Sequence, residues 1–421
     1  MQDRWAHGFF YILAPRILTC MSVEVTLMVL CGLVIFSYLF DLIARQFKIP
    51  SVILLLLSGI GLRYLATWLE LPVPNFEAIL PLVGTIGLIL IVLEGALELK
   101  LEREKLGLIK RSLGSALFIL IITTTGIALF YQYLTGADLR TCFLNAVPLG
   151  VISSAIAIPS ASTLPGNRKD FIVYESSLSD IFGVILFNFL IANSTVNAMS
   201  FVRLGWQTIL ILILSAAFCL VLLYLLKRIT HHLKFFLIIA VLILVYAIGK
   251  YYHLPTLVIV LAFGLFLNNL HWIRVPWFKT IFKYDNFYKD FHQLNQLSGE
   301  SAFIVRTFFF LIFGFTLDVA SLQHLSVLIN GGVVVVVIYA VRILYMKFFV
   351  RQAGAAEYFL APRGLISILL FFSIPENQKI SAIENSLLFF VILATSLIMT
   401  FGLISSRQEN PAVTPAQPDP S

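Results

Sequence analysis

The chain has 421 residues, of which 59% are hydrophobic and only 12% are charged, and its mean hydropathy is +0.95. A water-soluble globular protein does not carry so apolar a composition, so we expect an all-α polytopic membrane protein. The net charge of +7 suits loops that meet anionic lipid and does not indicate nucleic-acid binding.

The cysteine and histidine patterns indicate neither a metal site nor an enzyme. No C-x-x-C pair occurs among the four cysteines, Cys20, Cys31, Cys142 and Cys219, so no disulfide framework is expected. The sequence has no H-E-x-x-H or G-x-S-x-G motif, and no aspartyl pair falls on facing spans. We therefore expect no enzymatic activity and no cofactor.

Residues 1–21 are expected to form an extracytoplasmic extension, since they lack the ordered regions of a signal peptide. Met21 directly precedes the first apolar run, so both Met1 and Met21 stay open as the start. Residues 22–406 are the expected transmembrane domain, and residues 407–421, rich in proline and small polar residues, a disordered cytoplasmic tail. Runs long enough to cross a bilayer predict about thirteen spans, at residues 23–43, 50–69, 78–97, 112–134, 140–163, 171–193, 204–226, 233–250, 254–270, 297–319, 323–349, 354–374 and 385–405.

Lysine and arginine gather in the loops on one side of the predicted bundle. These loops lie at residues 45–48, 100–111, 168–169, 227–234, 274–289 and 347–351. Cytoplasmic loops carry such an excess, so we expect the N-terminus outside and the C-terminus in the cytoplasm. The loop at 271–296 alternates aromatic and basic residues and predicts an interfacial helix.

Three pairs of segments match in the same order across the two halves of the chain. They are Ile49–Ile53 with Leu254–Val258, Leu93–Glu98 with Phe313–Asp318, and Pro148–Ser153 with Pro362–Ser367. The offset is about 205–220 residues each time, and the matched members lie about seven spans apart. An odd number of spans reverses the direction of the second half, so the pattern indicates an inverted-topology repeat.

The third pair places proline and glycine deep in a span, and a second proline follows in each half. These residues are Pro148, Gly150 and Pro159 in the first half, and Pro362, Gly364 and Pro375 in the second. Proline removes a backbone donor, and irregular backbone is tolerated at membrane depth only where protein or a water-filled cavity satisfies it. We expect two discontinuous helices that cross near the midplane, with two ordinary proline kinks as the alternative.

The apolar run that begins at Tyr174 carries two carboxylates, Glu175 and Asp180. Asp180 lies about ten residues past Arg168–Asp170, and at ~1.5 Å per residue this is ~15 Å, half of a ~30 Å hydrocarbon core. A carboxylate at that depth costs at least ~2.5–3.5 kcal/mol, so Asp180 is expected at a coupling-ion site. The alternative is a structural carboxylate that pairs with a buried arginine.

Other charged residues fall inside the predicted spans. Glu175 and Arg342 share a depth, so we expect a structural pair between their spans. Arg363 is then free to offset the helix ends at the crossing or to face Asp180. Arg306 lies as deep, and its partner stays open. Glu94 and Glu98 lie toward the cytoplasmic end of their span, where a funnel or interfacial role is expected.

At these residues the chain resembles the monovalent cation:proton antiporter superfamily, in its sodium/proton exchanger branch. The E-S-S-L-S-D run Glu175–Asp180 resembles the family's E-S-x-x-N-D run. Pro362–Gly364 resembles its R-G helix, Tyr339–Arg342 the preceding arginine helix, and Phe308–Asp318 its F-F-x-x-x-G-x-x-L-D span. The resemblance covers essentially all of residues 22–405.

The resemblance implies a thirteen-span fold with two inverted repeats and crossed discontinuous helices. It implies dimer-interface helices at about 22–99 and 233–319, a linker helix at about 204–226, and an elevator-like ion-translocating core at about 112–193 and 323–405. It also implies a homodimer in a lipid bilayer, in a bacterial inner membrane, with a monovalent cation and H⁺ as partners.

For the site, the resemblance implies that Asp180 binds the transported Na⁺ or K⁺ in competition with a proton, and that Glu175 pairs with Arg342. The chain departs from the family at Ser179, where the family has Asn, and at Ile158, where it has Asp. Neutral oxygens of Ser153, Ser154 and Ser160 are then expected beside Asp180. One titratable carboxylate indicates exchange of one cation for one proton, with Na⁺ expected first and K⁺ or Li⁺ open.

Two other functions stay open at this point. The missing aspartate and the buried arginines are compatible with a transporter of the same fold that couples Na⁺ or H⁺ to an organic anion. A non-transporting membrane sensor or a channel-like pore is the second alternative, and a pore would pass ions without a pH gradient.

Overall fold

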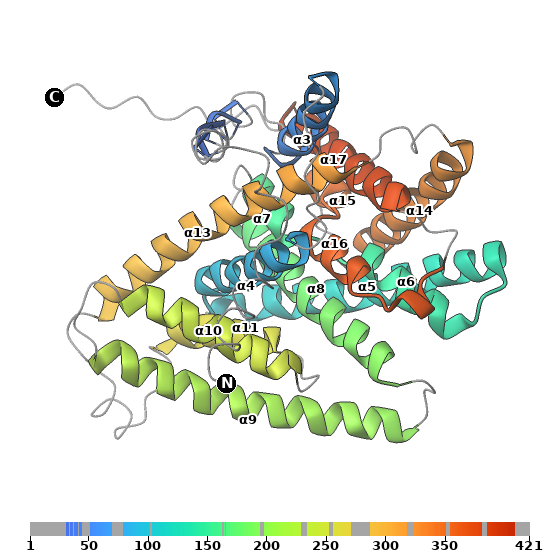
Figure 1. Ribbon diagram of the computed structural model, residues 1–421. Coiled ribbons are helices and arrows are strands. Elements are labelled where there is room, and N and C mark those ends of the chain that lie inside the picture. Colours follow the sequence, from blue (N-terminus) through green and yellow to red (C-terminus); the bar gives the residue numbers. More distant parts are fainter. Residues whose placement is uncertain are drawn as a thin grey trace, which may run out of the picture.

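The computed structural model describes residues 31–32, 34–36, 38–40, 42–43, 51–69, 79–101, 103–161, 164, 166–193, 198–228, 234–251, 256–270, 287–317, 324–350, 354–380 and 385–408. Within these ranges all regular structure is helical and no strand occurs (Figure 1). Eight helical segments of the described residues are long and apolar enough to cross a membrane. The expected all-α polytopic fold is therefore confirmed.

The helices of the described residues fall into two halves of the chain. The first half contains α3 (Ser51–Trp68), α4 (Leu80–Glu98), α5 (Leu106–Thr135), α6 (Leu139–Gly150), α7 (Ser154–Ala161) and α8 (Gly166–Ala192). The second half contains α9 (Ala198–Arg228), α10 (Lys234–Tyr251), α11 (Leu257–Asn268), α13 (Phe287–Thr316), α14 (Leu325–Tyr345), α15 (Ala355–Phe359), α16 (Leu365–Phe372) and α17 (Asn385–Gln408).

Each predicted span from residue 50 onward coincides with one of these helices or with a pair of half-helices. The span predicted at 23–43 lies mostly outside the described residues, as do the extension 1–21 and the tail beyond Gln408. The part of the loop 271–296 that the structure describes, from Phe287, is not a separate interfacial helix. It is the beginning of α13, which buries Asp290 and Leu294.

Two discontinuous helices are present, as the sequence predicts. Residues 151–153 separate α6 from α7, and residues 360–364 separate α15 from α16. Pro148 lies inside α6 and Gly150 is its last residue, while Pro159 lies inside α7. Pro362 and Gly364 both lie in the second break.

The two breaks touch each other through their main chains. The amide of Ser153 donates a hydrogen bond of 2.9 Å to the carbonyl of Pro362. The crossing needs a glycine at 364, because a Cβ there would lie 2.7 Å from Ser153 Oγ. The non-helical backbone of each span is therefore satisfied partly by the other, as interrupted helices inside a membrane require.

The helix packing repeats between the two halves. In the sequence, the span of α3 matches that of α11, and the span of α4 matches that of α13. In the structure α3 packs on α13, and α11 packs on α4. A glycine permits each contact: a Cβ on Gly59 would lie 2.2 Å from Leu311 O, and one on Gly264 would lie 2.5 Å from Ala96 Cβ. These are equivalent contacts, as two inverted repeats produce.

The helices pack as two groups that meet at α4. One group joins α3, α4, α11 and α13, with α9 along α11; the other joins α5, α6, α7, α8, α14, α15, α16 and α17. The central helix α4 belongs to the first group and also contacts α7, α8 and α16 of the second (Figure 1). Both broken helices therefore lie in one group, against a helix of the other.

Candidate functional site

Asp180 lies on α8 beside the break between α6 and α7, and its side chain is only 2% exposed. Its Oδ2 accepts hydrogen bonds from the main-chain amide of Ser154, at 3.3 Å, and from the Ser154 hydroxyl. Ser154 is the first residue of α7. The carboxylate therefore faces the positive end of a half-helix, where free amides stabilise negative charge.

Two buried oxygen atoms at this break have no hydrogen-bond partner among the described residues. They are Asp180 Oδ1 and Ser153 Oγ. Buried polar atoms are almost always paired, so unpaired oxygens beside a carboxylate indicate a place for a ligand. Carboxylate and neutral oxygens are the groups that hard cations prefer.

Ser179 lies at the same break but makes a different contact. Its Oγ accepts a hydrogen bond of 3.0 Å from the amide of Ile152. This contact holds the irregular backbone between α6 and α7 against α8. The expected role of Ser179 as a cation ligand stays a prediction.

Arg363 caps the end of α6. Its Nε donates to Leu149 O at 2.7 Å, its Nη2 to Gly150 O at 3.3 Å, and its Nη1 to Ala361 O at 3.0 Å. The last carbonyls of a helix have no intrahelical donor, and they form the negative end of its dipole. The sequence left two partners open for Arg363, the helix ends at the crossing and Asp180. The hydrogen bonds to Leu149 O and Gly150 O go to a helix end.

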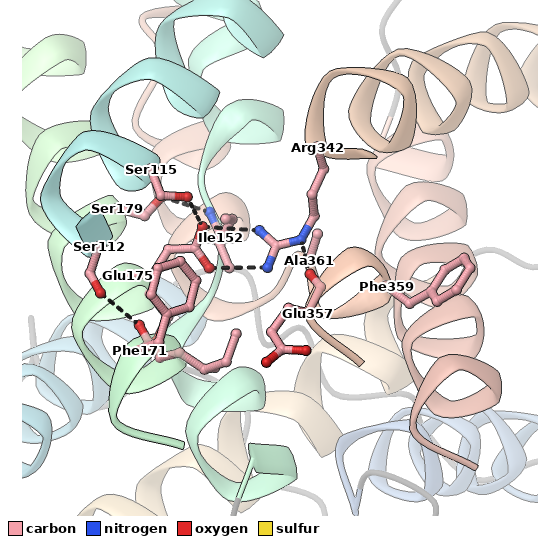
Figure 2. Close-up of polar contacts among 12 residues, drawn as sticks. Ser112, Ser115, Ile152, Phe171, Glu175, Ser179, Arg342, Glu357, Phe359 and Ala361 are labelled. Carbon is pink, nitrogen blue, oxygen red and sulfur yellow. Dashed lines mark hydrogen bonds and ion pairs between the residues drawn. The ribbon is translucent and has the colours of Figure 1, made fainter. Parts of the chain in front are cut away.

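Glu175 and Arg342 form a buried ion pair between α8 and α14 (Figure 2). Arg342 Nη2 lies 3.0 Å from Glu175 Oε2 and Nη1 lies 3.2 Å from Oε1, with the two side chains 0% and 1% exposed. Ser115 of α5 also donates to Glu175, and Arg342 Nε donates to Glu357 O at 2.7 Å. The structure thus brings together the two residues that were expected to pair, and it joins α5, α8, α14 and α15.

A second ion pair near this one was not expected from the sequence. Arg168 Nε lies 3.2 Å from the Glu357 carboxylate, which is nearly buried and also accepts from the amide of Gly354 at 2.9 Å. In the sequence Arg168 resembles any other basic loop residue, and Glu357 lies in no pattern that predicts a buried ion pair. No sequence signal would have paired them.

Arg306, whose partner the sequence left open, reaches the first broken helix from α13. Its Nη1 donates to the carbonyl of Ala155 on α7 at 3.0 Å. Ile158, at the position where the resemblance implies that the family has an aspartate, lies on the same half-helix near Gly95 of α4. A Cβ on Gly95 would lie 3.2 Å from Ser177 Oγ and 3.5 Å from Ile158 Cδ1. This position therefore carries an apolar side chain, as the sequence indicated.

The comparisons with known proteins agree with the fold. The family described as "Sodium/hydrogen exchanger, transmembrane" matches residues 31–405. No curated protein matches the sequence significantly. A structure of the sodium proton antiporter MjNhaP1 from Methanocaldococcus jannaschii at pH 8 superimposes with a TM-score of 0.66 at 18% identity, covering 92% of this chain and 100% of that one. An electron-microscopy structure of the same antiporter gives 0.65 at 16% identity, covering 94% and 100%.

Proposed function

Since this chain belongs to the sodium/hydrogen exchanger family and exchanges a cation for a proton across a membrane, we propose that the exchange takes place at Asp180. A monovalent cation, Na⁺ before K⁺ or Li⁺, and a proton compete for this one carboxylate. The observation that carries the proposal is the pair of unpartnered buried oxygens, Asp180 Oδ1 and Ser153 Oγ, beside the end of a half-helix.

Competition at one buried carboxylate enforces exchange. A bare carboxylate in an apolar interior is costly, whereas the protonated group is neutral and the cation-bound group is paired. The protein can therefore change its access from one side of the membrane to the other when Asp180 is protonated or cation-bound, but not when Asp180 is empty and charged. Because residue 158 is isoleucine, Asp180 is the carboxylate of the break, and one cation is exchanged for one proton.

Alternating access requires that the site move or that its surroundings do. We place the movement between the two helix groups that meet at α4. The core helices, about 112–193 and 323–405, carry Asp180 and both breaks, and the helices at about 22–99 and 233–319 form the scaffold and the interface of a homodimer. The excess of lysine and arginine in one set of loops supports an orientation with the C-terminus in the cytoplasm. The membrane that we propose is a bacterial inner membrane.

The organic-anion alternative relies on Arg363 and Arg306 as anion ligands. Both guanidinium groups donate to main-chain carbonyls, Arg363 through three of its nitrogens. This use of the two arginines favours a cation as the substrate.

The test is cation-driven proton movement in proteoliposomes that hold a pH-sensitive dye. Asp180→Asn keeps the size of the side chain and its acceptor for Ser154 but cannot release a proton or carry charge. We expect the Na⁺-dependent flux to disappear while the purified variant elutes as the wild type does in size-exclusion chromatography. Undiminished flux in the folded variant would remove Asp180 from the mechanism.

A further inference from the structure

The first broken helix contains a carbonyl that its own sequence leaves without a partner. In an α-helix the carbonyl of Ala155 would accept from the amide of residue 159. Residue 159 is a proline inside α7 and has no amide hydrogen. Buried carbonyls need a donor, so the first turn of α7 depends on a group from outside the helix.

Arg306 supplies that donor from another helix. Its Nη1 donates to Ala155 O at 3.0 Å from α13, which packs against α3 and α4. The bond therefore runs from the scaffold group to the group that contains both breaks. It joins α13 directly to the half-helix whose first residue binds Asp180.

The path from Arg306 to the carboxylate is short, because one peptide bond joins the two residues that make hydrogen bonds to Arg306 and to Asp180. Ala155 directly follows Ser154, and Ser154 donates to Asp180 Oδ2 through both its amide and its hydroxyl. Any shift of the first turn of α7 therefore moves both donors of Asp180. The unpartnered Ser153 Oγ precedes the same turn and would move with it.

A carboxylate of the scaffold group also belongs to the electrostatic surroundings of Arg306. Glu94 of α4 interacts electrostatically with Arg306. The carboxylate of Glu94 faces α13, since its Oε1 would lie 3.5 Å from a Cβ on Gly299, two turns before Arg306. Arg306 thus donates to the carbonyl of α7 while a scaffold carboxylate offsets part of its charge.

We propose that Arg306 is a positioning residue for cation exchange: it pairs the carbonyl that Pro159 leaves free and so sets the place of Ser154 against Asp180. This inference rests on the proposed function of Asp180. Arg306 acts through α7 and does not touch the cation.

The test compares two arginines that make the same kind of bond. Arg306→Met keeps the length of the side chain and removes its donors, and Arg306→Lys restores a charged donor. The matched control is Arg63→Met: Arg63 Nη1 donates to the carbonyls of Phe315, Thr316 and Leu317, all within the α3–α13 contact and away from α7.

The apparent KM for Na⁺ and the maximal rate are measured in proteoliposomes, per amount of folded protein, at three pH values. We expect Arg306→Met to raise the KM about tenfold, as loss of a charged hydrogen bond would, with a smaller change in the maximal rate. Arg306→Lys should bring the KM most of the way back to the wild-type value, and Arg63→Met should change the KM less than twofold. A purely structural arginine would instead lower the yield of folded protein and leave the KM unchanged.

A double-mutant cycle with Pro159→Ala tests the cause. Alanine at 159 brings back an amide that donates to Ala155 O inside α7, so the effect of Arg306→Met on the KM should fall below about threefold in that background. A full tenfold effect there, or equal effects of Arg306→Met and Arg63→Met, would overturn the inference. If Asp180→Asn abolishes exchange and Arg306→Met leaves it unchanged, this inference alone is refuted. If the wild type shows no exchange, the proposed function is refuted as well.

Discussion

Arg342→Met would break the buried pair with Glu175. Among the residues that the structure describes, the interior carboxylate would keep the Ser115 hydroxyl alone as a donor. Two of the lost hydrogen bonds join the guanidinium to the carboxylate, at 3.0 and 3.2 Å, and a third joins it to Glu357 O at 2.7 Å. Removing one partner of a buried ion pair costs about 3–5 kcal/mol, because the remaining charge is uncompensated. The double variant Glu175→Gln with Arg342→Met removes that charge and should recover about 1–4 kcal/mol of this loss.

The measurement is the apparent melting temperature of the purified protein in detergent, followed by the loss of the monodisperse peak in size-exclusion chromatography. One kcal/mol corresponds to ~2–4 °C in a domain of 150–250 residues and to less in a longer chain, so we expect Arg342→Met to melt roughly 5–10 °C below the wild type. The control is Lys379→Met, which breaks the pair of Lys379 and Glu376 at the surface, where Glu376 is 86% exposed. Exposed pairs contribute about 0–1 kcal/mol, so this variant should melt with the wild type. The reasoning is refuted if Arg342→Met melts like Lys379→Met, or if the double variant melts below the single one.

Two further substitutions test the site and the crossing. Ser153→Ala removes a hydroxyl that has no partner within the described part of the chain, so it should leave the melting temperature unchanged while raising the KM for Na⁺ several-fold. An unchanged KM would exclude Ser153 as a cation ligand. Gly150→Ala places a Cβ 2.3 Å from Thr124 Oγ1 and should destabilise the protein by about 1–3 kcal/mol. The control is Gly107→Ala, which has no atom within 4 Å of the new Cβ and should not destabilise it. Equal melting temperatures of the two variants would contradict the close packing of α5 on the break.

The sequence predicts well what depends on depth along a span. Glu175 and Arg342 were expected to pair because each could be placed at a distance from the same membrane surface. Pro362 and Gly364 likewise predicted a break, since both residues oppose a helix wherever they stand in its interior. These features need only the position along the chain and the direction in which each span runs.

The sequence fails where the direction of a side chain around its helix decides the contact. Arg306 was expected deep in its span without a partner, and its partner is a main-chain carbonyl on a helix about 150 residues away in sequence. The contact of Ser179, whose oxygen accepts from the amide of Ile152, likewise could not be predicted from the sequence. Both contacts depend on how the helices rotate against one another, which hydropathy does not report in helices that are apolar on every side.

The hydrogen bond from Ser153 to Pro362 has a consequence for how this architecture tolerates sequence change. It joins two main-chain atoms, so every residue except proline at position 153 can make it. Drift of the side chains around the crossing therefore leaves the link between the two interrupted spans intact. A chain that keeps small residues and prolines at the same positions along these spans can tolerate substitution of most other residues and still bring the two non-helical segments together.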